Sequence, residues 1–138
     1  MIDINRIRSN INNYYKQKKE EHYKEHTRKR NEMWLKYYGS TQWKELRNNY
    51  YQQHCLCECC LKQGRVLPAE EVHHIHKFSS GITEEAKWRL LLNENNLISL
   101  CSHHHDIAHK YMNNNHTDIA DIDDILYYEE HINKMIGQ

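Results

Sequence analysis

The stretch CSHHHDIAH, residues 101–109, holds one cysteine and four histidines within nine positions. Thiolate sulfur and imidazole nitrogen are good ligands for transition metals, zinc in particular. His105 and His109 are four residues apart, so on a helix they share one face and can bind one ion together. The stretch therefore predicts metal binding, and it raises the question of whether one ion or two are bound.

A structural zinc site is the first candidate. Cys57 and Cys60 form a CxxC pair, and Cys101 and His104 repeat the same spacing. A tight turn lets the two members of each pair reach one ion, and two pairs complete a tetrahedral site. We therefore predict zinc bound by Cys57, Cys60, Cys101 and His104. The spacing leaves other ligand choices open, namely Cys55, Cys59 and His103.

A second site is suggested by the histidine pair in VHHI, residues 72–75. Adjacent residues of a strand point to opposite faces, so His73 and His74 do not easily bind the same ion. One ring can bind a metal together with His105 and His109, while the other stays available as a base. By itself such a pair would indicate two half-exposed surface residues. Three other histidines are expected at the surface: His54, His76 and His116.

Taken together, these motifs resemble the HNH endonuclease family, the ββα-metal or His-Me finger nucleases. The shared features are VHHI, then NLxxLCxxHHxxxH, preceded by CxxC. The resemblance covers residues 37–110, and within it the stretch 37–75 resembles the phage-encoded members in particular. The resemblance implies an α+β fold in which a zinc knuckle joins a ββα-metal core of two short antiparallel strands and one helix.

The resemblance also implies a role for each matching residue. His74 matches the general base that activates water, and Asn96 matches the middle asparagine, which fixes the loop carrying the base. The catalytic divalent metal has three matching ligands: His73, His105 and His109. The structural zinc has Cys57, Cys60 and Cys101, with His104 where the family usually has cysteine. Ser79, Ser80 and Gly81 stand where the family often has two glycines.

The resemblance implies metal-dependent hydrolysis of DNA phosphodiester bonds that leaves 5′-phosphate and 3′-hydroxyl ends. A neutral imidazole, with a pKa near ~6.5, can accept a proton from water, but general-base help contributes only roughly 10²–10⁴-fold. A divalent ion, Mg²⁺, Mn²⁺ or Ni²⁺, must therefore supply most of the remaining rate. Two alternatives stay open: a non-catalytic zinc-knuckle module that binds nucleic acid, and a phage packaging nuclease active only with a terminase partner.

The hydrophobic spacing predicts the elements that position these residues. Helices are expected over 3–38, over 41–53 and through CSHHHDIAHKYM, and a helical turn is expected at 83–91 within a connecting segment. Strands are expected around Val72 and Ile75 and in NLISL. A last amphipathic helix is expected to be capped at Thr117 or Asp118, with the apolar stripe Ile119, Ile122, Ile125 and Leu126. The fold class is therefore α+β and mostly helical.

The net charge of zero conceals an uneven distribution. Residues 1–50 carry twelve basic and six acidic side chains, a balance of +6, whereas residues 111–138 carry one and six, a balance of −5. We divide the chain into a basic arm at 1–38, a nuclease core at 39–113 and an acidic helix at 114–138. The arm is expected to contact DNA phosphates, although a solvated helix face explains it equally well. The candidate contacts are Lys16, Lys18, Lys19, Arg28, Lys29 and Arg30.

Composition limits the remaining possibilities. An odd set of five cysteines with CxxC spacing fits metal binding in a reducing, cytoplasmic setting better than a disulfide framework. No signal peptide is recognised at the start, and no apolar run approaches the ~18 residues of a membrane span. A homodimer formed through the first helix is a further possibility.

Overall fold

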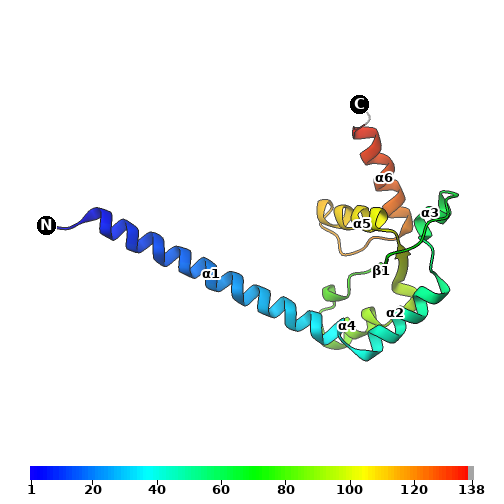
Figure 1. Ribbon diagram of the computed structural model, residues 1–138, viewed down its shortest axis with the longest axis horizontal. Coiled ribbons are helices and arrows are strands. Elements are labelled where there is room, and N and C mark those ends of the chain that lie inside the picture. Colours follow the sequence, from blue (N-terminus) through cyan, green and yellow to red (C-terminus); the bar gives the residue numbers. More distant parts are fainter. Residues whose placement is uncertain (137–138) are drawn as a thin grey trace. The chain divides into compact units, whose positions relative to one another are not determined.

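The computed structural model describes residues 1–136, and within that range the chain forms six α-helices and two β-strands (Figure 1). Their order is α1 (Ile4–Tyr37), α2 (Thr41–Gln53), α3 (Glu58–Lys62), β1 (Glu71–His74), α4 (Glu84–Leu91), β2 (Leu97–Leu100), α5 (Ser102–Asn114) and α6 (Ile122–Ile136). The chain divides into two compact units, Met1–Ser40 and a second that begins at Thr41. The predicted mostly helical α+β class is confirmed. No helix in the described range is long and apolar enough to cross a membrane.

The first unit consists of α1, a long helix whose side chains are almost all exposed. Asp3 caps its start, because the Asp3 side chain accepts a hydrogen bond from the Arg6 backbone N–H at 3.1 Å. The helix ends at Tyr37, shortly before Gly39. A Cβ at Gly39 would lie 2.3 Å from the backbone oxygen of Leu35, so only glycine fits this exit from the helix.

The second unit is built around an antiparallel strand pair. Strands β1 and β2 pair in the register Glu71↔Leu100 to His74↔Leu97. Helix α5 begins directly after β2 and packs on both strands, which completes a ββα arrangement. The core lies between β2, α3, α5 and α6; among its apolar members are Ile98, Leu100, Ile107, Ala108, Met112 and Ile125.

A short knuckle precedes the strands. Its two ends are joined by backbone hydrogen bonds, from Cys57 N–H to the Leu67 oxygen at 2.8 Å and from Ala69 N–H to the Cys55 oxygen at 2.9 Å. Helix α3 lies between these ends and closes at Gly64, whose φ of +75° lies in the left-handed region that favours glycine. The knuckle therefore presents its cysteines from a rigid hairpin-like turn.

The last helix starts later than the sequence predicted. Capping at Thr117 or Asp118 is wrong, because Asp121 and Asp124 cap the helix by accepting hydrogen bonds from each other's backbone N–H, at 2.8 and 3.1 Å. The preceding segment pairs instead with the chain that follows β1. Ala120 N–H donates to the Ile75 oxygen at 2.9 Å, and Ile119 lies in a bridge to His76 rather than in the helical stripe.

Candidate metal centres

Three cysteines and one histidine form a buried group that could hold a metal ion: Cys57, Cys60, Cys101 and His104. The Nδ1 atom of His104 lies 3.5 Å from the Cys57 sulfur, 3.5 Å from the Cys60 sulfur and 3.3 Å from the Cys101 sulfur. The Cys60 and Cys101 sulfurs are 3.9 Å apart. Tetrahedral zinc, with Zn–S of about 2.3 Å and Zn–N of about 2.0 Å, requires edges of about 3.5 Å (S···N) and 3.8 Å (S···S). The donor atoms therefore fit a tetrahedral ion.

Two turns supply these four ligands. Cys57 caps α3, with its sulfur 3.5 Å from the Cys60 backbone N–H, so the CxxC pair faces one point. Cys101 immediately precedes α5, and His104 lies in the first turn of that helix, so packing of α5 against the knuckle joins the pairs. The alternative ligands lie elsewhere: Cys59 is buried in the core beside the group, and Cys55 is exposed.

Glu129 of α6 orients the histidine of this group. Its Oε2 lies 2.8 Å from His104 Nε2, its Oε1 lies 3.1 Å from His103 Nε2, and Gln63 Nε2 donates to Oε2 at 3.0 Å. Burial raises the pKa of Glu129, but hydrogen bonds from His103 and His104 outweigh it and hold the pKa below its usual value. A carboxylate on the second ring nitrogen is the usual support of a metal-binding histidine.

Three further histidines form a second group that could hold a metal ion: His73, His105 and His109. The Nε2 atoms of His105 and His109 are 3.0 Å apart, and the ring centres of both lie 6.0–6.1 Å from that of His73. Burial decreases from His73 through His105 to the exposed His109, so the group opens toward solvent. An open side is the property that separates a catalytic metal centre from a structural one.

The His73 ring supplies the test of fit. One ring nitrogen donates to the Ala120 backbone oxygen, while Nε2 is buried and has no hydrogen-bond partner. Burial, together with the neighbouring His105 and His109, lowers the pKa of His73 to about 3. A neutral imidazole with an unpaired buried lone pair, facing two other imidazoles, suits a divalent cation better than it suits a proton.

His74 points to the other face of β1, as strand geometry requires. Its ring packs on Trp43 and Phe78, with ring centres 4.6 and 5.8 Å away, and only 6% of the residue is exposed. Its Nε2 donates to the Leu91 oxygen at the end of α4, at 3.1 Å. Burial lowers the pKa of His74 more than this hydrogen bond raises it. The ring is therefore neutral, held in one orientation and largely enclosed.

Asn96 acts on the backbone that follows the histidine pair. Its side-chain oxygen accepts from the His76 N–H at 2.8 Å, and its side-chain nitrogen donates to the oxygens of His76 and Leu90, both at 2.9 Å. Asn96 thus clamps the loop after β1 to the end of α4. The surface prediction for His76 is wrong, because the residue is half-buried and its ring bonds to Ser80 Oγ at 3.0 Å. His54 and His116 are exposed, as expected.

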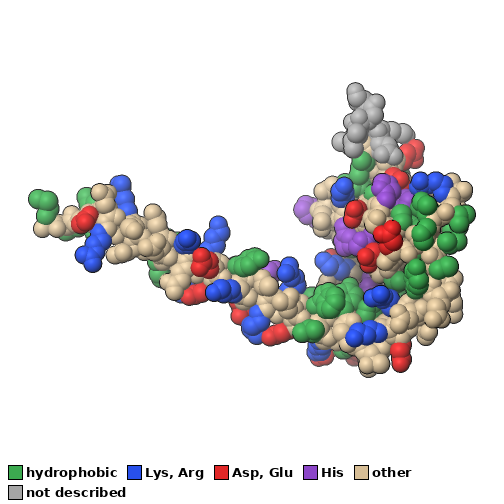
Figure 2. Space-filling model, in the orientation of Figure 1, with side chains coloured by type: hydrophobic (Ala, Val, Ile, Leu, Met, Phe, Trp, Pro, Cys, Tyr) green, Lys and Arg blue, Asp and Glu red, His purple; other side chains and the backbone are tan. Residues whose placement is uncertain are grey.

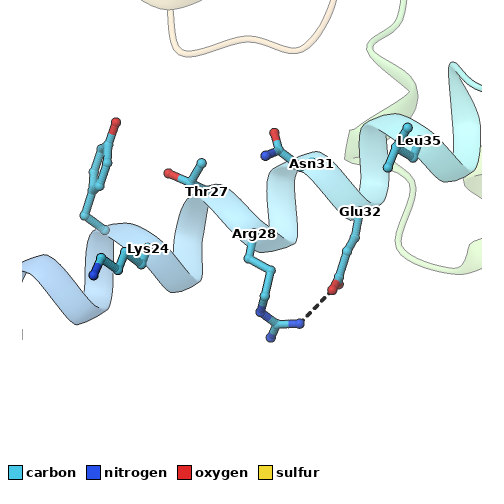
Figure 3. A pocket seen from close by; sticks show the side chains of 7 residues that line it. Lys24, Thr27, Arg28, Asn31, Glu32 and Leu35 are labelled. Atoms are coloured by element: carbon cyan, nitrogen blue, oxygen red, sulfur yellow. Dashed lines mark hydrogen bonds and ion pairs between the residues drawn. The ribbon is translucent and has the colours of Figure 1, made fainter.

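The six predicted DNA contacts lie on α1 and differ in their surroundings. Arg28 is held between Glu25 and Glu32, with nitrogen–oxygen distances of 2.6 Å to each. Figure 3 shows the contact with Glu32. The other ion pairs join Lys18 to Glu21 and Lys29 to Glu25. Over the described residues, no ion pair engages the remaining three: Lys16, Lys19 and Arg30. In the space-filling view, histidines gather on the second unit and basic side chains line the helix (Figure 2).

Sequence reasoning missed three partners of these groups. Glu129 was part of an unremarkable acidic helix, and its distance of 25 residues from His104 carries no local signal. The backbone oxygens of Ala120 and Leu91, which orient His73 and His74, leave no trace in residue type at all.

Comparison with known proteins gives one structural similarity. No protein-family model and no curated protein matches the sequence. Among solved structures, the chain is similar to the HNH endonuclease of the deep-sea thermophilic bacteriophage GVE2, determined with a manganese ion. The two share 26% identity with a TM-score of 0.48, and the match covers 67% of this chain and 94% of that one.

Proposed function

We propose that this chain is a metal-dependent endonuclease of the HNH type that hydrolyses DNA phosphodiester bonds. The observation that supports the proposal most strongly is the convergence of His105 and His109 on the buried, unpartnered Nε2 of His73. This group has one solvent-facing side and lies on the opposite face of β1 from a second, neutral imidazole. The Cys57, Cys60, Cys101 and His104 group would hold a structural zinc ion that fixes α5 to the knuckle.

In this mechanism His74 is the general base. A backbone oxygen can only accept, so the contact with Leu91 requires the proton on Nε2 and leaves the lone pair on Nδ1. Nδ1 then takes the proton of a water molecule that attacks phosphorus. Asn96 is a positioning residue, because it holds the backbone two residues beyond the base. A divalent ion held by His73, His105 and His109 would neutralise charge on the scissile phosphate and on the leaving oxygen.

The donor set bears on the choice of ion among Mg²⁺, Mn²⁺ and Ni²⁺. Three imidazole nitrogens and no carboxylate make up the group. Imidazole suits nickel, whereas magnesium and manganese prefer oxygen ligands. We therefore expect Ni²⁺ to bind most tightly and Mg²⁺ most weakly.

A second function, a non-catalytic zinc-knuckle module that binds nucleic acid, is supported by the enclosure of His74. A general base must reach the water that it deprotonates, and this ring is only 6% exposed and covered by Trp43 and Phe78. Under this proposal the histidine groups serve stability alone.

Nicking of supercoiled plasmid with each of the three ions separates the two functions. The proposed nuclease predicts nicking by the wild type, strong loss in His74→Ala and His109→Ala, and full activity in His54→Ala, which replaces an exposed histidine outside both groups. Equal nicking by wild type and His74→Ala would reject the proposed base. No nicking by any protein with any ion, with zinc bound and the chain folded, would favour the binding module.

A further inference from the structure

One face of α1 carries basic side chains without acidic ones. At about 100° per residue, four exposed basic residues fall within an arc of about 80°. They are Arg8, Lys16, Lys19 and Arg30, which we call the basic stripe. By the same helical spacing Tyr23 and Trp34 lie within this arc, and none of the acidic residues of α1 does.

The opposite face carries charges of both signs. Glu21, Glu25 and Glu32 lie there together with four basic residues, Lys18, Arg28, Lys29 and Lys36. The ion pairs of this face span 2.6–3.8 Å. Figure 3 shows Arg28 and Glu32 on one side of the helix and Thr27 and Asn31 on the other. This face therefore has a net charge of only +1, whereas the basic stripe has a charge of +4.

The spacing within the stripe suits a linear array of phosphates. Arg8, Lys19 and Arg30 are eleven residues apart, which is three helical turns plus about 20°, so they stay in line. At about 1.5 Å per residue, the stripe extends about 33 Å from Arg8 to Arg30, close to the roughly 34 Å of one turn of B-DNA. Tyr23 and Trp34 are 70% and 58% exposed beside these cations.

We propose that the basic stripe is the surface of α1 that binds the phosphate backbone of duplex DNA, and that the paired face does not contribute. The inference rests on the proposed function, which makes DNA the substrate. The inference divides the six predicted contacts into two sets. Lys16, Lys19 and Arg30 bind phosphates. Lys18, Arg28 and Lys29 are neutralised by glutamates, and these glutamates would repel phosphates. It also adds Arg8 to the binding surface.

Two triple variants of the full chain test this division. K16Q/K19Q/R30Q and K18Q/R28Q/K29Q each remove two lysines and one arginine, so their net charges are equal. Glutamine is a good helix former, and circular dichroism would check that α1 is retained in both. Binding of a fluorescent DNA duplex is followed by anisotropy over a series of salt concentrations, without added divalent ion, so that cleavage does not interfere.

Each phosphate contact contributes about −0.9 to the slope of log K against log salt. Loss of three contacts in K16Q/K19Q/R30Q should therefore reduce the slope by about 2.7, while K18Q/R28Q/K29Q should change it by less than about 1. Equal changes in the two variants, or no change in either, would overturn the inference. The plasmid assay separates this failure from that of the proposed function: a wild type that binds duplex through the stripe yet nicks nothing rejects the nuclease alone.

Discussion

Replacing Glu129 with glutamine should weaken zinc binding without removing a zinc ligand. The substitution keeps the size of the side chain and one acceptor oxygen, but it removes the negative charge 2.8 Å from His104 Nε2. The side chain is only 12% exposed, so water does not replace the lost interaction. The His104 ring would then face a neutral amide, which holds its tautomer and its orientation toward the three sulfurs less firmly than the carboxylate does.

The expected size follows from two independent considerations. Loss of such a supporting carboxylate typically lowers metal affinity about 10–100-fold, which corresponds to about 1.4–2.7 kcal/mol. Hydrogen bonds to charged groups contribute about 1.5–3 kcal/mol and neutral ones about 0.5–1.5 kcal/mol, so the exchange alone costs about 1 kcal/mol or more. This cost agrees with the lower end of the range expected from metal affinity, about 1.4 kcal/mol or a tenfold loss.

Competition with a chromophoric chelator would measure the zinc affinity of wild type and variant. Glu130→Gln is the matched control, because it removes the same charge from the adjacent, exposed position of α6. Cys57→Ser, which removes a ligand, sets the scale of a severe loss. If Glu129→Gln binds zinc as tightly as Glu130→Gln while Cys57→Ser does not, the carboxylate has no role in holding the metal.

Three further predictions concern stability and pH. Asn96→Ala should lower the free energy of unfolding, measured in urea, by about 2–4 kcal/mol, because the backbone groups that Asn96 contacts lose their hydrogen bonds. Asn95→Ala, at an exposed position, should change it by less than about 0.5 kcal/mol. Equal effects of the two substitutions would contradict the proposed clamp. Cleavage should rise with pH with a midpoint below pH ~6.5, because the base acts when neutral and burial lowers the pKa of His74. A midpoint above ~6.5 would refute that assignment. Tyr50→Phe should lower the free energy of unfolding by about 1–2 kcal/mol, because the Tyr50 hydroxyl lies 2.7 Å from Glu58 Oε2 and 2.8 Å from the Leu97 oxygen. An unchanged midpoint of urea unfolding would show that these two contacts do not stabilise the fold.

Local spacing in the sequence determined a large part of the fold. Helix 41–53 was predicted with the bounds that α2 has, and the first helix was predicted to within one residue at each end. The strand containing His73 and the helix containing His105 were also predicted, because hydrophobic period, glycine and capping residues act over a few neighbouring residues. The start of the last helix was missed because Thr117, Asp118 and Asp121 are all suitable caps, and only the pairing of Ala120 with Ile75 excludes the first two.

The tertiary structure decided which side chains meet. His103, His104 and His105 are adjacent on α5, so their directions differ by about 100° per residue, and the packing of that helix determines which one faces the sulfurs. His104 points at the knuckle, His105 points at His73, and His103 points at Glu129. The enclosure of His74 by Trp43 likewise joins residues 31 positions apart. The sequence alone determined which potential metal ligands this protein carries, because residue type and spacing are local, while the partner of each ring depends on contacts between distant segments.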